Sequence, residues 1–323
     1  MNLRRLLVGT IGAALVVAAG QCGAEAVMDG AVRVLRVRVA ADDELRARAD
    51  WEQVVRDHLQ FASDYYEKTF DIRFDVQEIV AWDSDDESAG LGDLVDELEK
   101  TIPVTGVDVV IGLSAQRPKP GKLSKYVGLP TGLTPSLGRV SLVRVMPDDE
   151  NYDLRLALIH EVAHLFGAFH TAQQDSIMRE SVQGPRTFQI DVENGKMVRL
   201  LRLFDFEKGV EGLDEDTLKR MTGIWERGGI PGDANPVAEA LFNVGVEKHD
   251  QGQVEEAIKT WRRAAAYDKT YAQPHGSIGL ALASLKRYDE ALRELQIADR
   301  LGCPEAKQAI EMVKHQSAAR GSR

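Results

Sequence analysis

The sequence predicts an α+β domain followed by an all-α domain, and three observations lead to this prediction. Runs of β-branched and apolar residues alternate with helix-like patterns over residues 27–230. A stretch rich in Gly and Pro, residues 228–236, then marks a linker. Beyond this linker the composition becomes alanine-rich and helical, and similar residues recur 34 positions apart.

The first 26 residues are predicted to be a secretory signal peptide. Two arginines precede an apolar segment, residues 6–19, which is too short to span a membrane as a mature helix, and an Ala-Glu-Ala sequence at 24–26 offers a cleavage site. We therefore expect export to the periplasm or the extracellular medium, with no stable transmembrane span in the mature chain. Two alternatives stay open: a retained membrane anchor, and lipid attachment at Cys22, although Gln21 before that cysteine fits a lipoprotein signal poorly.

Charge and cysteine content exclude some classes of protein. The chain carries a formal net charge of −11, so we do not expect nucleic-acid binding. After cleavage of the signal peptide the chain keeps one cysteine, Cys303, and one thiol cannot form a disulfide within the chain. The fold must therefore depend on its apolar core.

The elements of the first domain follow from the period of their apolar residues. Alternation predicts strands, and a continuous apolar run over residues 107–113 predicts a strand buried on both faces. Apolar residues at helical intervals predict a helix starting at Asp42 and two more over 91–101 and 153–166. The expected strands are residues 32–39, 72–82, 107–113 and 139–146.

Three of the seven histidines lie in one stretch of eleven residues, His160 to His170, with the pattern H-E-x-x-H-x-x-G-x-x-H. On a helix, His160 and His164 lie on one face about one turn apart and can aim two imidazoles at one metal. Gly167 permits the left-handed backbone conformation that ends a helix, so the chain can turn back and His170 can supply a third nitrogen.

Three protein ligands leave a fourth position open for water, which is the arrangement of a catalytic zinc site. The expected cofactor is therefore one catalytic Zn²⁺ ion held by His160, His164 and His170. Glu161 lies next to the first ligand and can act as the general base that takes a proton from water during hydrolysis of a peptide bond. The alternative is that the histidines belong to the core or to a structural metal clip, but neither needs the glutamate.

A methionine follows the third histidine closely, in Asp175-Ser176-Ile177-Met178-Arg179. Together with the histidine motif, this segment resembles the metzincin clan of zinc endopeptidases, whose zinc helix is followed by a tight turn carrying a methionine. The resemblance implies a twisted mixed sheet with long helices, and a Met178 that packs beneath the imidazoles without binding zinc. Thr171 and Glu180 depart from the known subfamilies, so we expect a matrixin-like metzincin of unassigned subfamily.

The resemblance also implies a substrate-binding role for residues 139–146. In metzincins an edge strand above the zinc pairs with an extended substrate, whereas an interior strand would have no such role; both alternatives stay open. Beyond the methionine turn, residues 188–192 and 197–204 are expected to form a hairpin around Asn194-Gly195, because Asn-Gly is a strong turn signal. A closing helix is expected over 213–225.

The last domain contains two segments that match each other at a spacing of 34 residues. Gly245 matches Gly279 and Trp261 matches Leu295. This spacing is the period of tetratricopeptide repeats, in which small residues let paired helices approach and large residues fill the space between layers. We expect two repeats and a capping helix over residues 236–316, followed by a tail over 317–323.

These features predict a secreted zinc-dependent endopeptidase. Its substrate would be a protein or peptide, and its repeat module would bind the substrate or a partner protein, or would only support the neighbouring domain. The alternative function is a non-catalytic binding protein in which the repeats do the binding and the zinc site is structural. Since two repeats are few for independent stability, the module is expected to dock on the first domain.

Overall fold

The computed structural model describes residues 31–85, 90–116, 132–146, 153–179 and 187–321. The predicted signal peptide, Cys22 and Glu180 lie outside the described residues. Within the described ranges, none of the helices combines the length and the apolar composition that crossing a bilayer requires. The described residues from Val32 onward pack as one unit.

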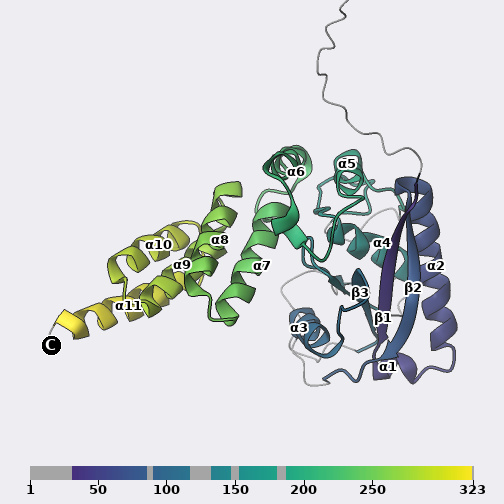
Figure 1. The fold of residues 1–323 in the computed structure, drawn as a ribbon, viewed down its shortest axis with the longest axis horizontal. Helices are drawn as coiled ribbons and strands as arrows, with labels where there is room; N and C mark the ends of the chain where they lie inside the picture. Colours follow the sequence, from purple (N-terminus) through teal and green to yellow (C-terminus); the bar gives the residue numbers. More distant parts are fainter. Residues whose placement is uncertain (1–30, 86–89, 117–131, 147–152, 180–186, 322–323) are drawn as a thin grey trace, which may run out of the picture. The chain divides into compact units, whose positions relative to one another are not determined.

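A five-stranded mixed sheet forms the centre of the first domain (Figure 1). The strand order is β2-β1-β3-β5-β4, in which only β4 runs antiparallel to its neighbour. The strands are β1 (Arg33–Ala41), β2 (Ile72–Ala81), β3 (Val109–Ser114), β4 (Gly132–Leu133) and β5 (Val140–Arg144). Every residue of β3 is buried, as expected for the continuous apolar run.

The position of β5 decides between the two interpretations of residues 139–146. This strand lies between β3 and β4, and all five of its residues are buried, so it is interior. Of the two alternatives, the interior strand is therefore correct and the edge strand is wrong. Within the described residues, the edge strand on this side of the sheet is β4, whose two residues pair with Leu142 and Val143. Sequence alone missed this because β4 is too short to show a pattern.

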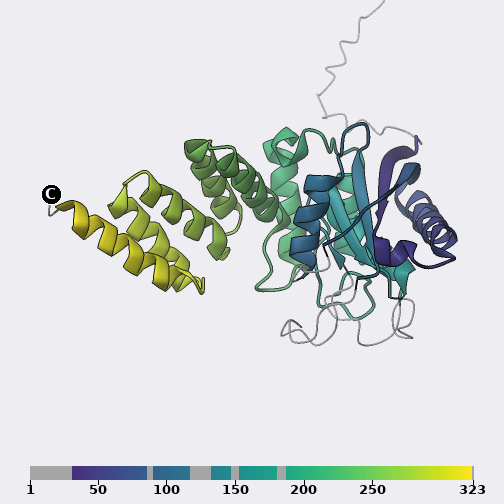
Figure 2. The ribbon, with the colours of Figure 1, turned by 90° about the horizontal axis from the view of Figure 1, so that it is seen from below.

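Helices cover both faces of the sheet. Helices α2 (Trp51–Phe70) and α4 (Leu154–Leu165) pack on one face and share a core with Val37, Ile111 and Val143. Helix α3 (Leu91–Thr101) packs on the opposite face against Val110 and Leu142 (Figure 2). A Cβ atom on Gly112 of β3 would lie 2.4 Å from Leu98 of α3, so a glycine is needed for this close approach.

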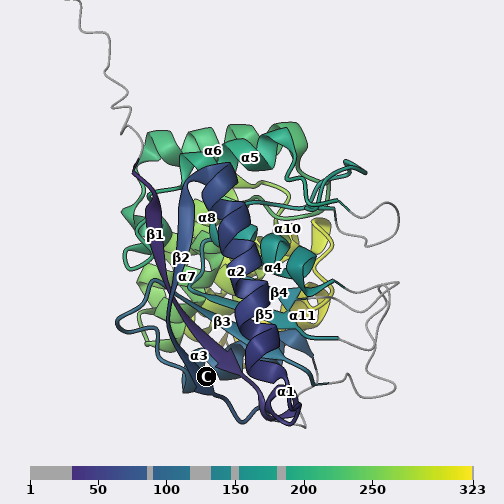
Figure 3. The ribbon, with the colours of Figure 1, turned by 90° about the vertical axis from the view of Figure 1, so that its right-hand side faces the viewer.

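Two expected elements differ in the structure. The helix that starts at Asp42 is broken into the short α1 (Asp43–Arg46) and α2, which begins at Trp51. The expected hairpin around Asn194-Gly195 is instead α5 (Val192–Leu200), followed by the 3₁₀ turn η1 (Gly209–Gly212) and by α6 (Glu215–Gly228), the expected closing helix. Figure 3 shows α5 and α6 side by side above α2. Asp191 caps α5, since its side chain accepts from the backbone N–H of Asn194, and this outweighs the turn signal.

The repeat module consists of two helix pairs and a further C-terminal helix. These are α7 (Pro236–Asp250), α8 (Val254–Tyr267), α9 (Ala272–Ser284), α10 (Tyr288–Arg300) and α11 (Ala306–Gly321). Helix α11 continues into the segment expected to be a tail, whose Ala and Arg residues favour helix. A Cβ on Gly245 would lie 2.3 Å from Trp261, and one on Gly279 would lie 2.6 Å from Leu295. The residues that match at 34 positions therefore make equivalent close contacts.

The first repeat shares a core with the sheet domain, and a second core joins its helix α8 to the second repeat and α11. Val237 and Leu241 of α7 and Ala264 of α8 belong to the apolar cluster that contains α4, α5 and α6. Polar contacts cross the same boundary: the Lys248 ammonium lies 2.5 Å from Glu211, and the Tyr267 hydroxyl donates to Glu215 over 2.6 Å. This packing supports the expectation that the module docks.

Candidate metal centre and active site

Helix α4 holds the first half of the candidate site. Asp153 caps its N-terminus by accepting from the backbone N–H of Arg155. The helix is apolar on most sides because it is buried between the sheet and α2, and the Tyr66 hydroxyl of α2 donates to the backbone carbonyl of Ile159 over 2.7 Å. The helix ends at Leu165, and Gly167 follows with a φ of 72°, the left-handed conformation expected there.

The structure brings the three predicted metal ligands together. One ligand atom from each of His160, His164 and His170 lies within 4.8 Å of the others, in the one such group of metal-binding side chains found among the described residues. The Nε2 atoms of His160 and His164 are 3.1 Å apart. Two nitrogens bound to one tetrahedral zinc ion would be roughly 3.4 Å apart, so the pair is spaced to share an ion.

Each imidazole uses its other nitrogen for a hydrogen bond. The Nδ1 atoms of His160 and His164 each lie 2.8 Å from a backbone carbonyl, of Ile177 and Ala168 respectively. His170 Nδ1 lies 3.2 Å from the Asp233 carboxylate. An Nδ1–H that donates to oxygen leaves the Nε2 lone pair for a metal, so all three rings are set as Nε2 ligands.

Burial also favours the neutral, metal-binding form of these histidines. Burial, together with the charge of the neighbouring His170, lowers the pKa of His160 to about 4. Burial likewise holds the pKa of His164 well below its ordinary value. Near neutral pH both rings are therefore unprotonated, which is the form in which an imidazole binds Zn²⁺.

Glu161 is buried beside the metal ligands and faces β4. Its Oε2 accepts a hydrogen bond of 2.8 Å from the Thr134 hydroxyl, which in turn contacts the Ser141 hydroxyl. Burial raises the pKa of Glu161 to about 7, and the Thr134 hydrogen bond opposes that rise. A Cβ on Gly132 would lie 2.6 Å from the Glu161 carboxyl carbon, so β4 needs a glycine here. Neither Thr134 nor Gly132 was expected from the sequence.

The methionine turn is held by a buried polar network. Met178 is fully buried, and its backbone carbonyl accepts from the Thr171 N–H over 3.0 Å. Its own N–H donates to the Ser176 hydroxyl, which donates to Asp191 over 2.7 Å. Asn194 also donates to Asp191, over 2.8 Å. The turn is thereby tied to the start of α5.

Asn194 also anchors the residue before the third ligand. Its side-chain oxygen accepts from the Phe169 N–H over 2.8 Å, and its side-chain nitrogen donates to the Phe169 carbonyl over 2.9 Å. Asn194 is fully buried. The sequence predicted a turn at this residue. An Asp three positions before it, with Glu193 in between, was the helix-start signal that could have shown otherwise.

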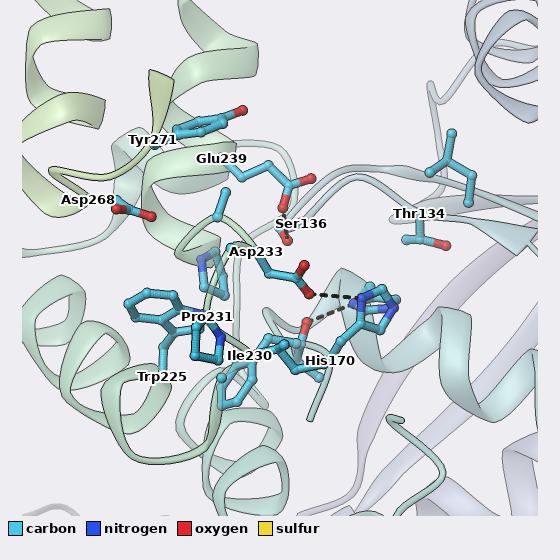
Figure 4. A pocket seen from close by; sticks show the side chains of 18 of the residues that line it. Thr134, Ser136, His170, Trp225, Ile230, Pro231, Asp233, Glu239, Asp268 and Tyr271 are labelled. Carbon is cyan, nitrogen blue, oxygen red and sulfur yellow. Dashed lines mark hydrogen bonds and ion pairs between the residues drawn. The ribbon is translucent and has the colours of Figure 1, made fainter. Parts of the chain in front are cut away.

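One large cavity joins the candidate site to the repeat module. Its volume is about 1650 Å³, and it is lined by His160 and Glu161 as well as by Asp268, Tyr271 and Arg300 of the repeats. Figure 4 shows Asp233 directed at His170, and Glu239 of α7 in contact with Ser136 of the sheet domain. The catalytic candidates thus open into a space whose far wall is helical repeat.

Comparison with known families assigns the first domain. A model described as metallo-peptidase family M12 matches residues 31–196, just over half of the chain. This chain belongs to the M12 metallopeptidase family. The match covers the zinc-ligand motif and the methionine turn, and it does not confirm the matrixin-like subfamily expected from the sequence. A second model, described as a TPR repeat, matches residues 245–286 of the M12 protein.

More distant comparisons add little. No curated protein matches the chain. Among solved structures, a chain of a chaperone–substrate complex is similar over 55% of this chain and 35% of its own length, at 10% identity and a TM-score of 0.38. This chain therefore spans about a third of that one. Archaemetzincin from Methanopyrus kandleri is similar over 51% of this chain and 93% of its own, at 16% identity and a TM-score of 0.40. Both likenesses are remote.

Proposed function

We propose that this M12-family protein is an exported zinc-dependent endopeptidase whose repeat module takes part in substrate recognition. The observation that carries the proposal is the convergence of three imidazoles beside a buried glutamate, at the edge of a large cavity. Export rests on the signal-peptide pattern of the sequence alone.

His160, His164 and His170 would hold the metal through their Nε2 atoms. When bound, zinc supplies the Lewis acidity that makes water a nucleophile near neutral pH. Glu161 accepts the proton of that water on its carboxylate and passes it to the nitrogen of the leaving amine. Thr134 holds the carboxylate in place over 2.8 Å, and burial keeps its proton affinity close to what neutral pH requires.

The repeats extend the substrate site on one side. Their residues Asp268, Tyr271 and Arg300 line the same cavity as Glu161. A peptide with its scissile bond near Glu161 would therefore contact the inner surface of the repeats. On the opposite side of the site, Gly132 of the edge strand β4 also lines the cavity, where an extended peptide can add by backbone hydrogen bonds.

The non-catalytic alternative is less well supported. A structural zinc site needs no carboxylate beside the ion and no opening to a cavity, and this protein has both. Its repeats also face the metal ligands, whereas a separate binding module would have no reason to line the same cavity.

The test combines metal analysis with cleavage mapping. We expect one zinc per chain by elemental analysis, and cuts in a peptide library, mapped by mass spectrometry, that disappear with a chelator and return with added zinc. The repeat contribution is tested with the same library by replacing Tyr271 with alanine, which should change the residues preferred at a distance from the cut. Zinc-loaded protein that cuts no peptide would exclude the peptidase function.

A further inference from the structure

The hydrogen-bond acceptors of the three imidazoles come from different parts of the chain. His160 and His164 donate to backbone carbonyls of the peptidase domain, over 2.8 Å each. His170 instead meets a side chain, Asp233 at 3.2 Å, and Asp233 belongs to the linker between α6 and α7. The family match ends at residue 196, so this acceptor comes from outside the matched region.

Asp233 is held in a tight turn of the linker. Its backbone N–H donates to the carbonyl of Ile230 over 3.2 Å, and it forms an isolated bridge with Pro231. Gly232 between them has a φ of 107°, which a residue with a side chain rarely adopts. The turn therefore fixes the direction in which the carboxylate leaves the backbone, and Figure 4 shows it pointing to His170.

The linker is in turn tied to the first repeat two residues further on. The Asn235 N–H donates to the Asp268 carboxylate over 3.0 Å, and the Asn235 side chain caps α7 by accepting from Val237 N–H over 2.9 Å. Asp268 lies in the loop between α8 and α9, is only 5% exposed, and also accepts from the Thr270 N–H and hydroxyl. A continuous path of hydrogen bonds and short backbone links thus runs from the repeat loop to the third metal ligand.

We propose that Asp233 is a positioning residue for the metal centre, and that the first repeat, through Asp268, holds it in contact with His170. A carboxylate on Nδ1 fixes the ring orientation and the tautomer of a histidine ligand and makes Nε2 a stronger donor. The repeat module therefore completes the metal site as well as the substrate cavity. This inference rests on the zinc binding proposed above.

The first experiment measures zinc affinity by competition with a chromophoric chelator, on the full chain. Asp233→Ala should weaken zinc binding about 10- to 100-fold, the usual effect of losing such a partner. Asp233→Asn should lose less, because an amide oxygen still accepts the hydrogen bond but carries no charge. Asp216→Ala and Asp216→Asn are matched controls, since Asp216 is exposed on α6, and they should bind zinc like the wild type.

A kinetic measurement separates positioning from substrate contact, because Asp233 also lines the cavity. If Asp233 positions His170, saturating zinc should restore most of the kcat of Asp233→Ala and leave KM unchanged, using a peptide found by the cleavage mapping. A raised KM with wild-type zinc affinity would overturn the proposal and make Asp233 a substrate contact.

A double-mutant cycle tests the role of the repeat. Asp268→Ala should weaken zinc binding in the wild-type background and have no further effect when Asp233 is already alanine. Asp268→Asn keeps an acceptor for the Asn235 N–H and should bind zinc nearly as well as the wild type. This variant shows whether the acceptor is what matters if the alanine variant unfolds. Equal losses from Asp268→Ala in both backgrounds would overturn the coupling. A wild-type chain without zinc would instead contradict the proposed function itself.

Discussion

His160 and His164 lie on one buried helix, whereas His170 lies five residues past its end, with 34% of its side chain exposed. The helical pair is held by the geometry of α4 and by nearby carbonyls. The third ligand depends on contacts with residues far along the chain: Asn194 holds its neighbour Phe169, and Asp233 meets its ring. The first two ligands, which form the local half of the site, are thus positioned by one helix. The third ligand, the assembled half, is positioned by contacts with residues distant in the sequence.

The largest loss of activity should come from a substitution in the local half of the site, at Glu161 of helix α4. Glu161→Gln keeps the shape and an acceptor for Thr134 but cannot take a proton, so kcat/KM should fall about 10³- to 10⁴-fold while one zinc stays bound. Peptide cleavage assays and elemental analysis check this. Glu52→Gln, an exposed change on α2, is the control. Cleavage at the wild-type rate would remove Glu161 from the mechanism.

The same substitution should stabilise the metal-free protein at high pH. Folding raises the pKa of Glu161 from 4.5 to about 7, so the buried carboxylate opposes folding above about pH 7, and this cost disappears as the pH falls below 4.5. Chelator-treated Glu161→Gln should therefore be more stable than chelator-treated wild type by about 3 kcal/mol at pH 8, and no more stable at pH 4. The histidines contribute equally in both proteins. Urea denaturation measures the difference, and a pH-independent one would contradict the assignment.

The position of the third ligand, His170, should be sensitive to substitutions that are distant from it in the sequence. Asn194→Ala leaves the buried N–H and carbonyl of Phe169 without partners, which should cost about 2 kcal/mol of unfolding free energy. Because Phe169 precedes the third ligand, zinc affinity should fall as well. Gln60→Ala, an exposed change on α2, should alter neither. If Asn194→Ala lowered stability but kept full zinc affinity, the third ligand would be as locally determined as the first two.

The smallest effect should be a shift in the pH dependence of kcat/KM when Thr134 is replaced. Its hydroxyl stabilises the charged form of Glu161 and so lowers the pKa of that residue. Thr134→Val should raise this pKa, and the acid limb of the kcat/KM profile should move up by roughly one pH unit. Thr134→Ser keeps the hydroxyl and should show no shift. A downward shift in Thr134→Val would mean that the hydroxyl does not support the carboxylate.

The same division explains how much could be predicted from the sequence. The ligand spacing on α4, the turn at Gly167 and the 34-residue repeat depend on local periodicity, and the sequence predicted all three. The helix at Val192–Leu200 and the interior place of β5 depend on partners distant in the chain: Asn194 bonds to Phe169, and β4 covers β5. Asp233 lies 63 positions from His170, in a segment that showed only a linker. No local pattern indicates such contacts.

The core shared by the first repeat and the peptidase domain determines the order in which parts of the protein should unfold. Val237, Leu241 and Ala264 are buried together with the helices around the metal ligands. Helices α9, α10 and α11 belong to a second cluster, whose other buried residues, Trp261 among them, come from α8. Heating or partial proteolysis should therefore release the distal helices α9–α11 first and leave the zinc ligands intact. The border between cooperative folding units would then fall inside the repeat array, and a truncation meant to isolate the peptidase should keep α8 and the following loop with Asp268, rather than end at the linker.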